Sequence, residues 1–325
     1  MPLQVESPLR VVAIGGGTGL SSLLRALKRE ATRSSAPWRL TGIVAVSDDG
    51  GSSGRLRQEL GGIPPGDLRN CLAALTREDS ILSDLLNYRF KGDGSMGGHS
   101  LGNLMLLALA DLSGNWVRAI RQLSTVLVTA GHLYPATATP VTLCAEDAKG
   151  QRLTGESAIN HARPPLTRLW IEPEDAEPLP ESVLASLRAD LVLLAPGSLH
   201  TSTIANLLIP DLREAVVRSN APVVYVANLM TEPGESHGLD LEAHVAAIQD
   251  LGQLHLSAVL ANSTPLPPDM ARRYANEGGQ PIHSEKDELR GVPILHRPLL
   301  DPEAGMARHH PDLLNQAIRE LLPRL

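Results

Sequence analysis

The chain alternates short apolar runs with longer segments whose apolar residues recur every three or four positions. Continuous apolar runs of about four to eight residues are typical of strands buried in a parallel sheet, whereas the wider spacing predicts amphipathic helices. The predicted strands span 9–14, 39–46, 191–196, 222–229, 256–263 and 292–299. The predicted helices between and after them span 20–30, 240–251 and 310–322. This order predicts an α/β fold with one doubly wound, mostly parallel sheet.

Two stretches interrupt the alternation. Across about residues 64–130 the apolar spacing is mainly that of helices, and Asp67 and Ser100 are candidate caps. Across about residues 140–175, short runs separated by turn residues predict a small antiparallel β insert, and a Pro-containing polar connection follows at 174–182. There is no internal repeat, so we expect a single domain over residues 1–325 that carries a helical block and the insert.

A glycine-rich segment, GGGTG, joins the first strand to the first helix. Backbone N–H groups at a helix N-terminus favour a phosphate, and glycine lets a ligand approach the backbone closely. The segment lacks the Lys of a Walker loop and does not match G-x-G-x-x-G. A tight turn that binds nothing is the alternative. The residues we expect to contact phosphate or ribose are Gly15, Gly16, Gly17, Thr18 and Gly19.

Two adjacent acids, Asp48 and Asp49, follow the second strand in the segment SDDGGSSGRLR. Carboxylate oxygens at a strand end suit Mg²⁺, which needs only one or two of them together with phosphate and water. The same side chains could hold a sugar hydroxyl, act as a base or cap a solvated turn. Arg55 and Arg57 could meet a phosphate or lie exposed on a helix. Asp48 and Asp49 are therefore our candidates for a catalytic and a metal-binding role.

The helical block contributes five residues of interest. His99, Ser100 and Asn103, in the segment GGHSLGN, are predicted to face the ligand from a helix N-terminus, with a purely structural cap as the alternative. That segment contains G-x-S-x-G but follows no apolar strand, as a hydrolase nucleophile elbow requires. Asp67 has either a site role or only a capping role, and Arg69 could hold a phosphate or pair with an acid.

Further polar segments follow the later strands. Because the carboxyl ends of parallel strands meet at one edge of a sheet, we expect these segments to gather with the earlier ones. The candidates there are Gly197, Ser198, Asn228, Thr231 and Glu235. The last three could read a base or a sugar. Arg308, which precedes the C-terminal helix, could clamp a phosphate.

The composition narrows the function classes. Aromatic residues make up 2% of the 325 residues and the net charge is -7, which excludes a general nucleic-acid binder. The two cysteines, Cys71 and Cys144, form no C-x-x-C and fit a reducing compartment. The histidines form no H-x-x-x-H pair suited to zinc. With no signal segment and no apolar run of roughly 18 residues, we expect a cytoplasmic protein without membrane contact.

Five segments together resemble a known family. They are GGGTGLSSLLRALK, VAVSDDGGSSGRLR, PPGDLRNCL, GHSLGNLML and ANLMTEPGES. In this order, from about Val11 to the C-terminus, the chain is similar to the bacterial YvcK-type gluconeogenesis factors of the CofD-like superfamily. The resemblance implies a Rossmann-like fold and a cytoplasmic protein tied to cell shape, cell-wall precursor supply and gluconeogenic growth. It also implies binding of UDP-sugars, notably UDP-N-acetylglucosamine, without established catalysis.

Two positions in the resemblance concern the ligand directly. The family's UDP-sugar binders carry a Tyr shortly after the PGE segment, and here Leu239 stands at the matching position. Their Arg near the C-terminus is matched by Arg308. The resemblance therefore implies a preserved phosphate contact and a missing aromatic contact.

These observations leave two hypotheses from different classes. The first is a regulatory protein that binds a nucleotide-sugar or other nucleoside diphosphate through Gly15–Gly19, Asn228 and Arg308, requires no cofactor and acts on a protein partner. Symmetry base rates suggest a homodimer. The second, implied by the CofD branch, is a Mg²⁺-dependent transferase of a phospholactyl-type group, in which Asp48 or Asp49 holds a metal that bridges a diphosphate. A nicotinamide-dependent oxidoreductase is disfavoured by the broken G-x-G-x-x-G pattern.

Overall fold

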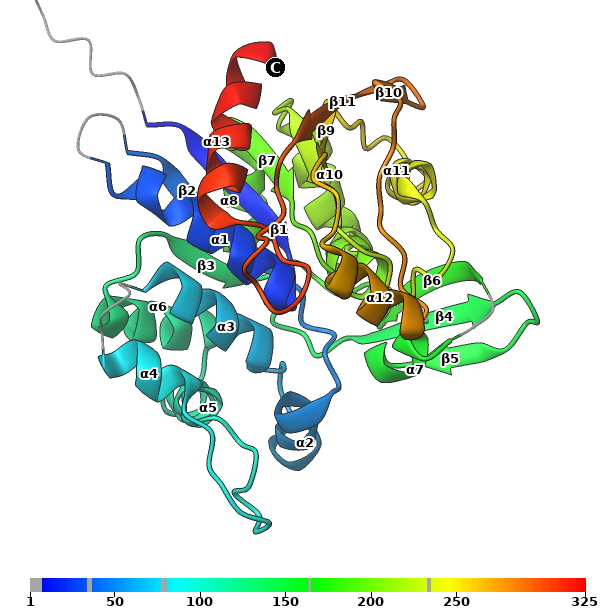
Figure 1. Ribbon diagram of the computed structural model, residues 1–325. Coiled ribbons are helices and arrows are strands. Elements are labelled where there is room, and N and C mark those ends of the chain that lie inside the picture. Colours follow the sequence, from blue (N-terminus) through cyan, green and yellow to red (C-terminus); the bar gives the residue numbers. More distant parts are fainter. Residues whose placement is uncertain (1–7, 34–36, 77–80, 163–164, 233–234) are drawn as a thin grey trace, which may run out of the picture.

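The computed structural model describes residues 8–33, 37–76, 81–162, 165–232 and 235–325. Eight strands form one sheet in the order β10-β11-β9-β8-β7-β1-β2-β3, and all neighbours pair in parallel except β10 with β11 (Figure 1). The strands are β1 (Arg10–Gly15), β2 (Arg39–Val44), β3 (His132–Pro135), β7 (Leu191–Leu194), β8 (Val223–Val226), β9 (Ala258–Asn262), β10 (Glu288–Leu289) and β11 (Val292–Arg297). The predicted α/β fold with a mostly parallel sheet is confirmed.

The order of the strands reverses at β1. The chain proceeds from β1 to β2 and β3 on one side, and later places β7, β8, β9 and β11 on the other. The pairing of β1 with β7 joins residues that lie far apart in sequence, and the ion pair between Arg10 and Asp190, at 2.6 Å, closes the same junction. Ligands of open α/β sheets bind beyond the strand ends at such a switch point.

Helices fill the connections between the strands. They are α1 (Gly17–Ala31), α2 (Gly51–Leu60), α3 (Gly66–Leu75), α4 (Ile81–Asn87), α5 (Leu101–Ser113), α6 (Trp116–Leu127), α7 (Glu156–Asn160), α8 (Pro180–Leu187), α9 (Ala205–Leu207), α10 (Pro210–Arg218), α11 (Leu241–Gln249), α12 (Pro268–Asn276) and α13 (Pro311–Leu321). A π-helix, η1 (Leu199–Ile204), follows β7, and a 3₁₀ turn, η2 (Leu322–Arg324), ends the chain. No helix among the described residues is long and apolar enough to cross a membrane.

The predicted β insert is a separate three-stranded antiparallel sheet. Its strands are β4 (Thr142–Asp147), β5 (Arg152–Thr154) and β6 (Leu166–Glu172), in the order β5-β4-β6. The insert lies to one side of the main sheet, and the short helix α7 extends from it (Figure 1). The helical block, α3 to α6, lies on the opposite side.

β3 and α8 are among the elements that differ from the sequence prediction. No strand was expected at β3, which has four residues at the sheet edge, and only Leu133 and Pro135 of its side chains are buried. The connection predicted at 174–182 contains the start of α8, whose buried positions are Ser182 and Ser186. Serines on the buried face erase the apolar spacing by which a helix is found in a sequence.

Candidate functional site

The loops after β1 and β7 touch each other where the sheet reverses. A Cβ on Gly15 would lie 2.8 Å from the Cβ of Ala195, and one on Gly19 only 1.7 Å from the carbonyl oxygen of Pro196. Only glycine permits this approach of backbone to backbone. The predicted gathering of the segment Gly15–Gly19 with the segment that contains Gly197 and Ser198 is what the structure shows.

A cleft of about 220 Å³ opens beside this junction. Its lining combines segments from the whole chain: Thr18, Gly19, Ser22, Pro196, Gly197, Asn228, Leu229, Met230, Thr231, Glu232, Tyr274, Ala307, Arg308 and His309. Six of the predicted ligand residues, Thr18, Gly19, Gly197, Asn228, Thr231 and Arg308, therefore line one cleft. The guanidinium of Arg308 is exposed and has no hydrogen-bond or ion-pair partner among the described residues.

The N-terminus of α1 supplies backbone donors to this cleft. Gly16, the N-cap residue, has no side chain, and the N–H of Gly17 donates to Oδ2 of Asp67 at 2.6 Å. The N–H groups of Thr18 and Gly19 have no acceptor among the described residues, as expected in the first turn of a helix. Together with the helix dipole they form a site for an anion.

An aromatic ring that the sequence analysis missed lines the cleft. Tyr274 comes from α12, and its hydroxyl accepts a hydrogen bond from the N–H of Ala307 at 3.1 Å, next to Arg308. Leu239, which was placed at the position of the family's Tyr, instead packs against the main hydrophobic core. Tyr274 lies 35 residues further along the chain (274 minus 239), in a helix that was not predicted from the sequence, so no spacing pattern connected it with the cleft.

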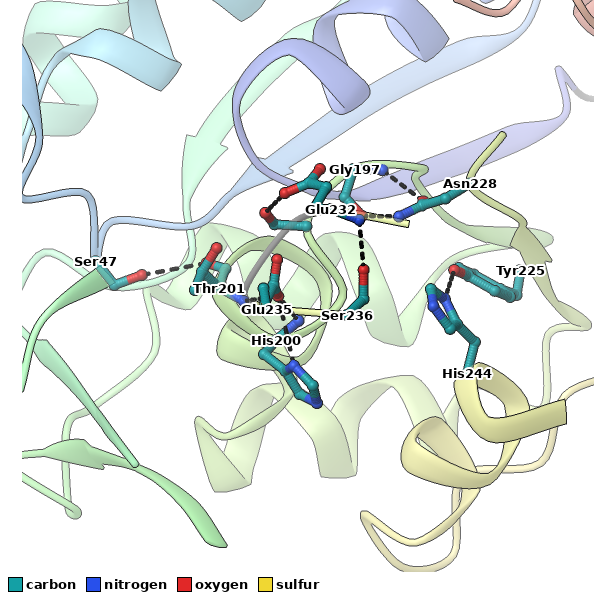
Figure 2. Close-up of polar contacts among 11 residues, drawn as sticks. Ser47, Gly197, His200, Thr201, Tyr225, Asn228, Glu232, Glu235, Ser236 and His244 are labelled. Carbon is teal, nitrogen blue, oxygen red and sulfur yellow. Dashed lines mark hydrogen bonds and ion pairs between the residues drawn. The ribbon is translucent and has the colours of Figure 1, made fainter. Parts of the chain in front are cut away.

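Asn228 contacts Gly197, as Figure 2 shows, and Ser198 contacts Glu232. The Asn228 amide pairs with the Gly197 peptide, since Oδ1 accepts from the N–H at 2.8 Å and Nδ2 donates to the carbonyl at 2.6 Å. Ser198 donates from Oγ to Oε2 of Glu232 at 2.7 Å. Thr231 is fixed to Gln280, whose N–H donates to Oγ1 at 2.9 Å. These bonds hold the post-strand loops in one geometry.

Glu235 is buried behind the cleft and fastens the π-helix. Its Oε1 accepts from the backbone N–H of His200 and, at 3.1 Å, from that of Thr201, as Figure 2 shows. Burial raises the pKa of Glu235, and that of Glu232 nearby is raised by burial and by Glu235. The predicted Glu235 therefore contacts the backbone of η1. Pro233 and Gly234 of the same PGE segment lie outside the described residues.

The π-helix and α9, which directly follows it, in turn contact the end of β1 and the loop after it. The Oγ of Ser202 would lie 3.1 Å from a Cβ on Gly16, and Asn206 donates from Nδ2 to the carbonyl of Gly15 at 3.0 Å. The Oγ of Ser47, directly before Asp48, donates to the carbonyl of Thr201 at 3.4 Å. The π-helix and α9 thus contact the segments that follow β1, β2 and β8.

On the other side of the loop lies a set of half-buried carboxyl groups. Partial burial, together with the charge of Asp48, raises the pKa of Asp67 to about 7. Glu156, at the start of α7, has its pKa raised to about 9 by partial burial and by Asp48, Asp67, Glu235 and Asp49, in that order. Partial burial also raises the pKa of Asp48, although Gly50 donates to its Oδ1 at 2.9 Å. We call Asp48, Asp67 and Glu156 the acidic cluster; they lie next to the cleft through Gly16 and Gly17 but do not line it.

Asp49 has a different neighbourhood from Asp48. Its Oδ1 accepts from the N–H and the Oγ of Ser157, at 2.9 and 2.8 Å, so it holds the N-terminus of α7. Gly155 packs against it, because a Cβ there would lie 1.9 Å from Oδ2. Among the described residues no group of three or more His, Cys, Asp and Glu side chains is arranged to hold a metal ion. Of the two candidates, Asp48 is the one whose charge raises the pKa of Asp67, so the pair Asp48 and Asp67 fits a Mg²⁺ that is shared with a phosphate better.

Ser52 connects the second loop with the helical block. Its Oγ lies 3.0 Å from Nδ1 of His99 and accepts from Nδ2 of Asn103 at 3.2 Å. Ser100 caps α5, since its Oγ accepts from the N–H of Asn103 at 3.1 Å. His99, Ser100 and Asn103 are all buried, and Oδ1 of Asn103 has no partner among the described residues. The capping role of Ser100 is confirmed, and the ligand contact of the three remains a prediction.

Three arginines from the first third of the chain form hydrogen bonds with other parts of the protein. Arg55 donates to the carbonyl of Gly97 at 2.9 Å, Arg57 to that of Val141 at 2.7 Å, and Arg69 to Oδ1 of Asn87 at 2.6 Å. Their guanidinium groups stabilise loops around the site. Glu156 was missed from the sequence because nothing in the β insert signals that its short helix faces the main domain.

Comparison with known proteins places these residues in a family context. The family model described as 2-phospho-L-lactate transferase CofD matches residues 11–300. The gluconeogenesis factor of Bacillus subtilis is 38% identical over 316 residues, which cover 96% of this chain and 98% of that protein. The gluconeogenesis factor of Listeria monocytogenes is 38% identical over 323 residues, which cover 99% and 98%.

A solved structure shows the same fold. The crystal structure of a member of the UPF0052 family from Bacillus halodurans superposes with a TM-score of 0.90 at 37% identity. The superposition covers 97% of this chain and 99% of the other. The similarity therefore extends over nearly the whole chain.

Proposed function

This chain belongs to the CofD family and has gluconeogenesis factors as relatives, and from that premise we propose that it is a regulatory protein that binds a nucleotide-sugar. The ligand class we propose is a UDP-sugar, with UDP-N-acetylglucosamine as the first candidate. Ligand occupancy would control a partner in cell-wall precursor supply, cell shape and growth on gluconeogenic carbon. The binding step needs no cofactor.

The observation that carries this proposal is the composition of the cleft. Among the residues that the structure describes, the N–H groups of Thr18 and Gly19 and the guanidinium of Arg308 have no partner, and these three residues line the same space as Tyr274. Amides at a helix N-terminus and an arginine suit a diphosphate. An aromatic ring suits stacking by a base. A cleft with both is suited to a nucleoside diphosphate.

The acidic cluster supports a neutral sugar at the other end of the ligand. Asp67 contacts Gly17, one residue before the amides that we assign to the phosphates. A group attached to the distal phosphate would therefore extend toward Asp67, Asp48 and Glu156. Carboxyl groups form hydrogen bonds with sugar hydroxyls, and once ionised they repel a further anion. The proposed distal group is a neutral or cationic sugar.

A transferase is the second candidate, favoured by the half-buried pair Asp48 and Asp67. Their charges influence each other, and Asp67 lies at the N-terminus of α1, where phosphate would bind. The pair fits one Mg²⁺ shared with a diphosphate, and Asp48 and Asp67 would hold it. When bound, the ion would neutralise charge on a leaving phosphate. The protein's own part would be to orient the diphosphate through Thr18, Gly19 and Arg308.

A thermal-shift and calorimetry panel separates the two. The ligands are UDP-N-acetylglucosamine, UDP-glucose, UDP, GDP, GTP and NAD, each with and without Mg²⁺. A ligand at about 100 times its dissociation constant adds roughly 2.7 kcal/mol of stability. A Mg²⁺-independent response to UDP-sugars supports the regulatory protein. A Mg²⁺-dependent response to guanine nucleotides, followed by turnover that Asp48→Asn abolishes, supports the transferase, and no response to any nucleotide overturns both.

A further inference from the structure

A carboxyl group lines the cleft that is otherwise suited to an anion. In the lining that the structure describes, Glu232 is the only Asp or Glu and Arg308 is the only Lys or Arg. His309, which also lines the cleft, is neutral at pH 7 because burial lowers its pKa to about 4. An ionised Glu232 would therefore cancel the charge of Arg308 and repel a diphosphate. The cleft attracts a diphosphate strongly only while Glu232 is neutral.

A second carboxyl group lies directly behind Glu232. The carboxyl groups of Glu232 and Glu235 are within hydrogen-bonding reach of each other, and the hydroxyl of Ser198 contacts both. Its bond to Oε2 of Glu232, at 2.7 Å, can be followed in Figure 2. Glu235 is 4% exposed, and its Oε2 has no partner among the described residues. A proton held between the two carboxyl groups would give this buried oxygen its partner.

The described residues offer no cation to this pair. Glu232 forms no ion pair among them, and Nδ1 of His200, 3.6 Å from Oε1 of Glu235, belongs to a ring whose pKa burial lowers to about 4. Glu156 on α7 and Tyr225 on β8 face the pair as well. Their pKa values are raised by burial and by charges that include that of Glu235. Burial raises the pKa of Glu232 and of Glu235, so the pair retains a proton.

The pair lies next to the amides that we assign to the phosphates. A Cβ on Gly19 would lie 3.0 Å from the Cα of Gly197, and the next residue, Ser198, holds Glu232. A neutral carboxyl group at this place donates a hydrogen bond from its O–H to a phosphate oxygen. An ionised carboxylate can only accept, and it repels the phosphate. Protonation of the pair and binding of a phosphate therefore favour each other.

We propose that the cleft binds the diphosphate of its ligand together with one proton from the solvent, which Glu232 and Glu235 take up so that Glu232 donates to a phosphate oxygen. The two carboxyl groups share one proton before binding and hold two when the ligand is bound. Affinity then falls with rising pH over the range in which the free pair holds one proton and the bound pair two. This inference rests on the proposed binding of a nucleoside diphosphate and adds its regulation.

Isothermal titration calorimetry of UDP without Mg²⁺, from pH 5 to pH 8.5, tests the proposal. Titrations in two buffers of different ionisation enthalpy give the number of protons taken up per bound ligand. For the natural chain we expect an uptake that approaches one proton. The dissociation constant should rise by up to about tenfold per pH unit where the uptake is complete. Titration of UDP itself is common to all variants, so it cancels when they are compared at one pH.

Glu232→Gln is the decisive variant, because its amide keeps a donor at every pH and binds no proton. It should take up about one proton less than the natural chain, and at pH 8.5 it should bind UDP roughly tenfold more tightly. Glu59→Gln, exposed on α2, is the matched control and should follow the natural chain. Asp67→Asn removes the carboxyl group that contacts Gly17 beside the phosphates, and it should keep the uptake by the pair. Thermal unfolding shows whether each variant keeps its fold.

The outcomes separate this inference from the proposed function. Equal proton uptake by the natural chain and by Glu232→Gln, with UDP bound to both, overturns the inference and leaves nucleotide binding intact. Weaker binding by Glu232→Gln at pH 8.5 also overturns it, since an ionised Glu232 would then hold the ligand. If Glu232→Gln does not fold, Asp67→Asn decides. A dissociation constant that stays constant from pH 7.5 to pH 8.5 overturns the inference, and one that rises supports it. Absence of UDP and GDP binding at every pH overturns the proposed function and this inference together.

Discussion

The carboxyl group of Asp67 accepts a hydrogen bond from the backbone N–H of Gly17 at 2.6 Å, across fifty residues of chain. The bond connects the N-terminus of α3 with that of α1. A Cβ on Gly16 would lie 3.0 Å from the same oxygen, so the contact also requires glycine. Asp67 thereby occupies one N–H of the α1 N-terminus, while the N–H groups of Thr18 and Gly19 stay available to a ligand.

Asp67→Asn should flatten the dependence of stability on pH. The pKa of Asp67 is about 7 in the folded protein, whereas the ordinary pKa of an aspartate is 3.8, so the folded state binds the proton more tightly than the unfolded chain. The stabilisation from that proton is complete below about pH 4 and is lost as the pH rises through 7. Asn cannot lose a proton, so the variant should lack this loss, of the order of a few kcal/mol.

Urea unfolding at pH 5 and pH 8 measures the effect. The exposed Asp93→Asn is the matched control and should follow the natural chain at both values. A steeper loss of stability at pH 8 in Asp67→Asn than in the natural chain would contradict the raised pKa. Glu156, with a pKa of about 9, contributes a loss of the same sign that continues to higher pH.

Arg308→Ala should weaken binding of UDP and of UDP-sugars alike, because it removes a contact to the shared diphosphate. A hydrogen bond to a charged group is worth about 1.5–3 kcal/mol, which corresponds to roughly a ten- to hundredfold rise in the dissociation constant. Isothermal titration calorimetry measures it. Arg272→Ala on α12, exposed and paired with Asp269, is the control and should bind normally. Equal affinities for both variants would remove Arg308 from the site.

Tyr274→Ala should cost about 1–3 kcal/mol of binding free energy through loss of base stacking, whereas Tyr274→Phe should keep most of the affinity. The Phe variant loses only the hydrogen bond from Ala307. Leu239→Ala should lower the free energy of unfolding and leave ligand affinity unchanged, since Leu239 packs on the core. The reverse result, with affinity lost in Leu239→Ala and kept in Tyr274→Ala, would return the contact to Leu239.

Glu235→Gln should preserve the π-helix better than Glu235→Ala. Because burial favours the protonated carboxyl, Gln resembles the native state and can accept from His200 and Thr201. Ala leaves two buried N–H groups unpaired, at about 1–3 kcal/mol each. Chemical unfolding measures the difference. Equal loss in both variants would show that the charge of Glu235, rather than its oxygen, fastens η1.

At pH 8, where Asp67 with its pKa of about 7 is mostly ionised, UDP-glucuronate should bind more weakly than UDP-glucose. The two ligands differ by one carboxylate at the sugar, which would meet the acidic cluster of Asp48, Asp67 and Glu156 and be repelled by its ionised members. Competition calorimetry against UDP measures the ratio, and the preference should fall in high salt. UDP is the internal control. Because it lacks the sugar, its affinity should be the same for the natural chain and for Glu156→Gln. Preference for UDP-glucuronate would place the sugar elsewhere.

The parts of the fold that follow from the sequence are those with a repeating pattern. β1, β8 and β9 are continuous apolar runs, and α1 and α13 show clear apolar spacing, so their approximate positions could be predicted. β3 could not, because it is a short edge strand whose place depends on β2. α8 could not be predicted either, because the serines on its buried face hide the apolar spacing of a helix.

The candidate site divides in the same way. Glycine-rich loops after strands are recognisable in the sequence. The site residues that could be predicted in this way are Thr18, Gly19, Gly197 and Asn228. Tyr274 and Glu156 could not, since each reaches the site through packing between distant segments. Glu235 was named for a ligand contact, which stays a prediction, and the structure shows that its Oε1 accepts hydrogen bonds from the backbone of η1. The residue type indicated that Glu235 accepts hydrogen bonds, but which donors it meets depends on how distant segments pack.

The pairing of β1 with β7 also determines at which stage of synthesis the cleft can form. Arg10 and Asp190 are paired although 180 residues separate them. Loop closure must therefore bring together two residues that lie more than half of the chain apart. Contacts of such long range form slowly. A ribosome-bound chain that ends before Leu191 has the loop after β1 but not its counterpart, and thus no cleft. The ability to bind the ligand should arise only after synthesis has passed this point, late in folding.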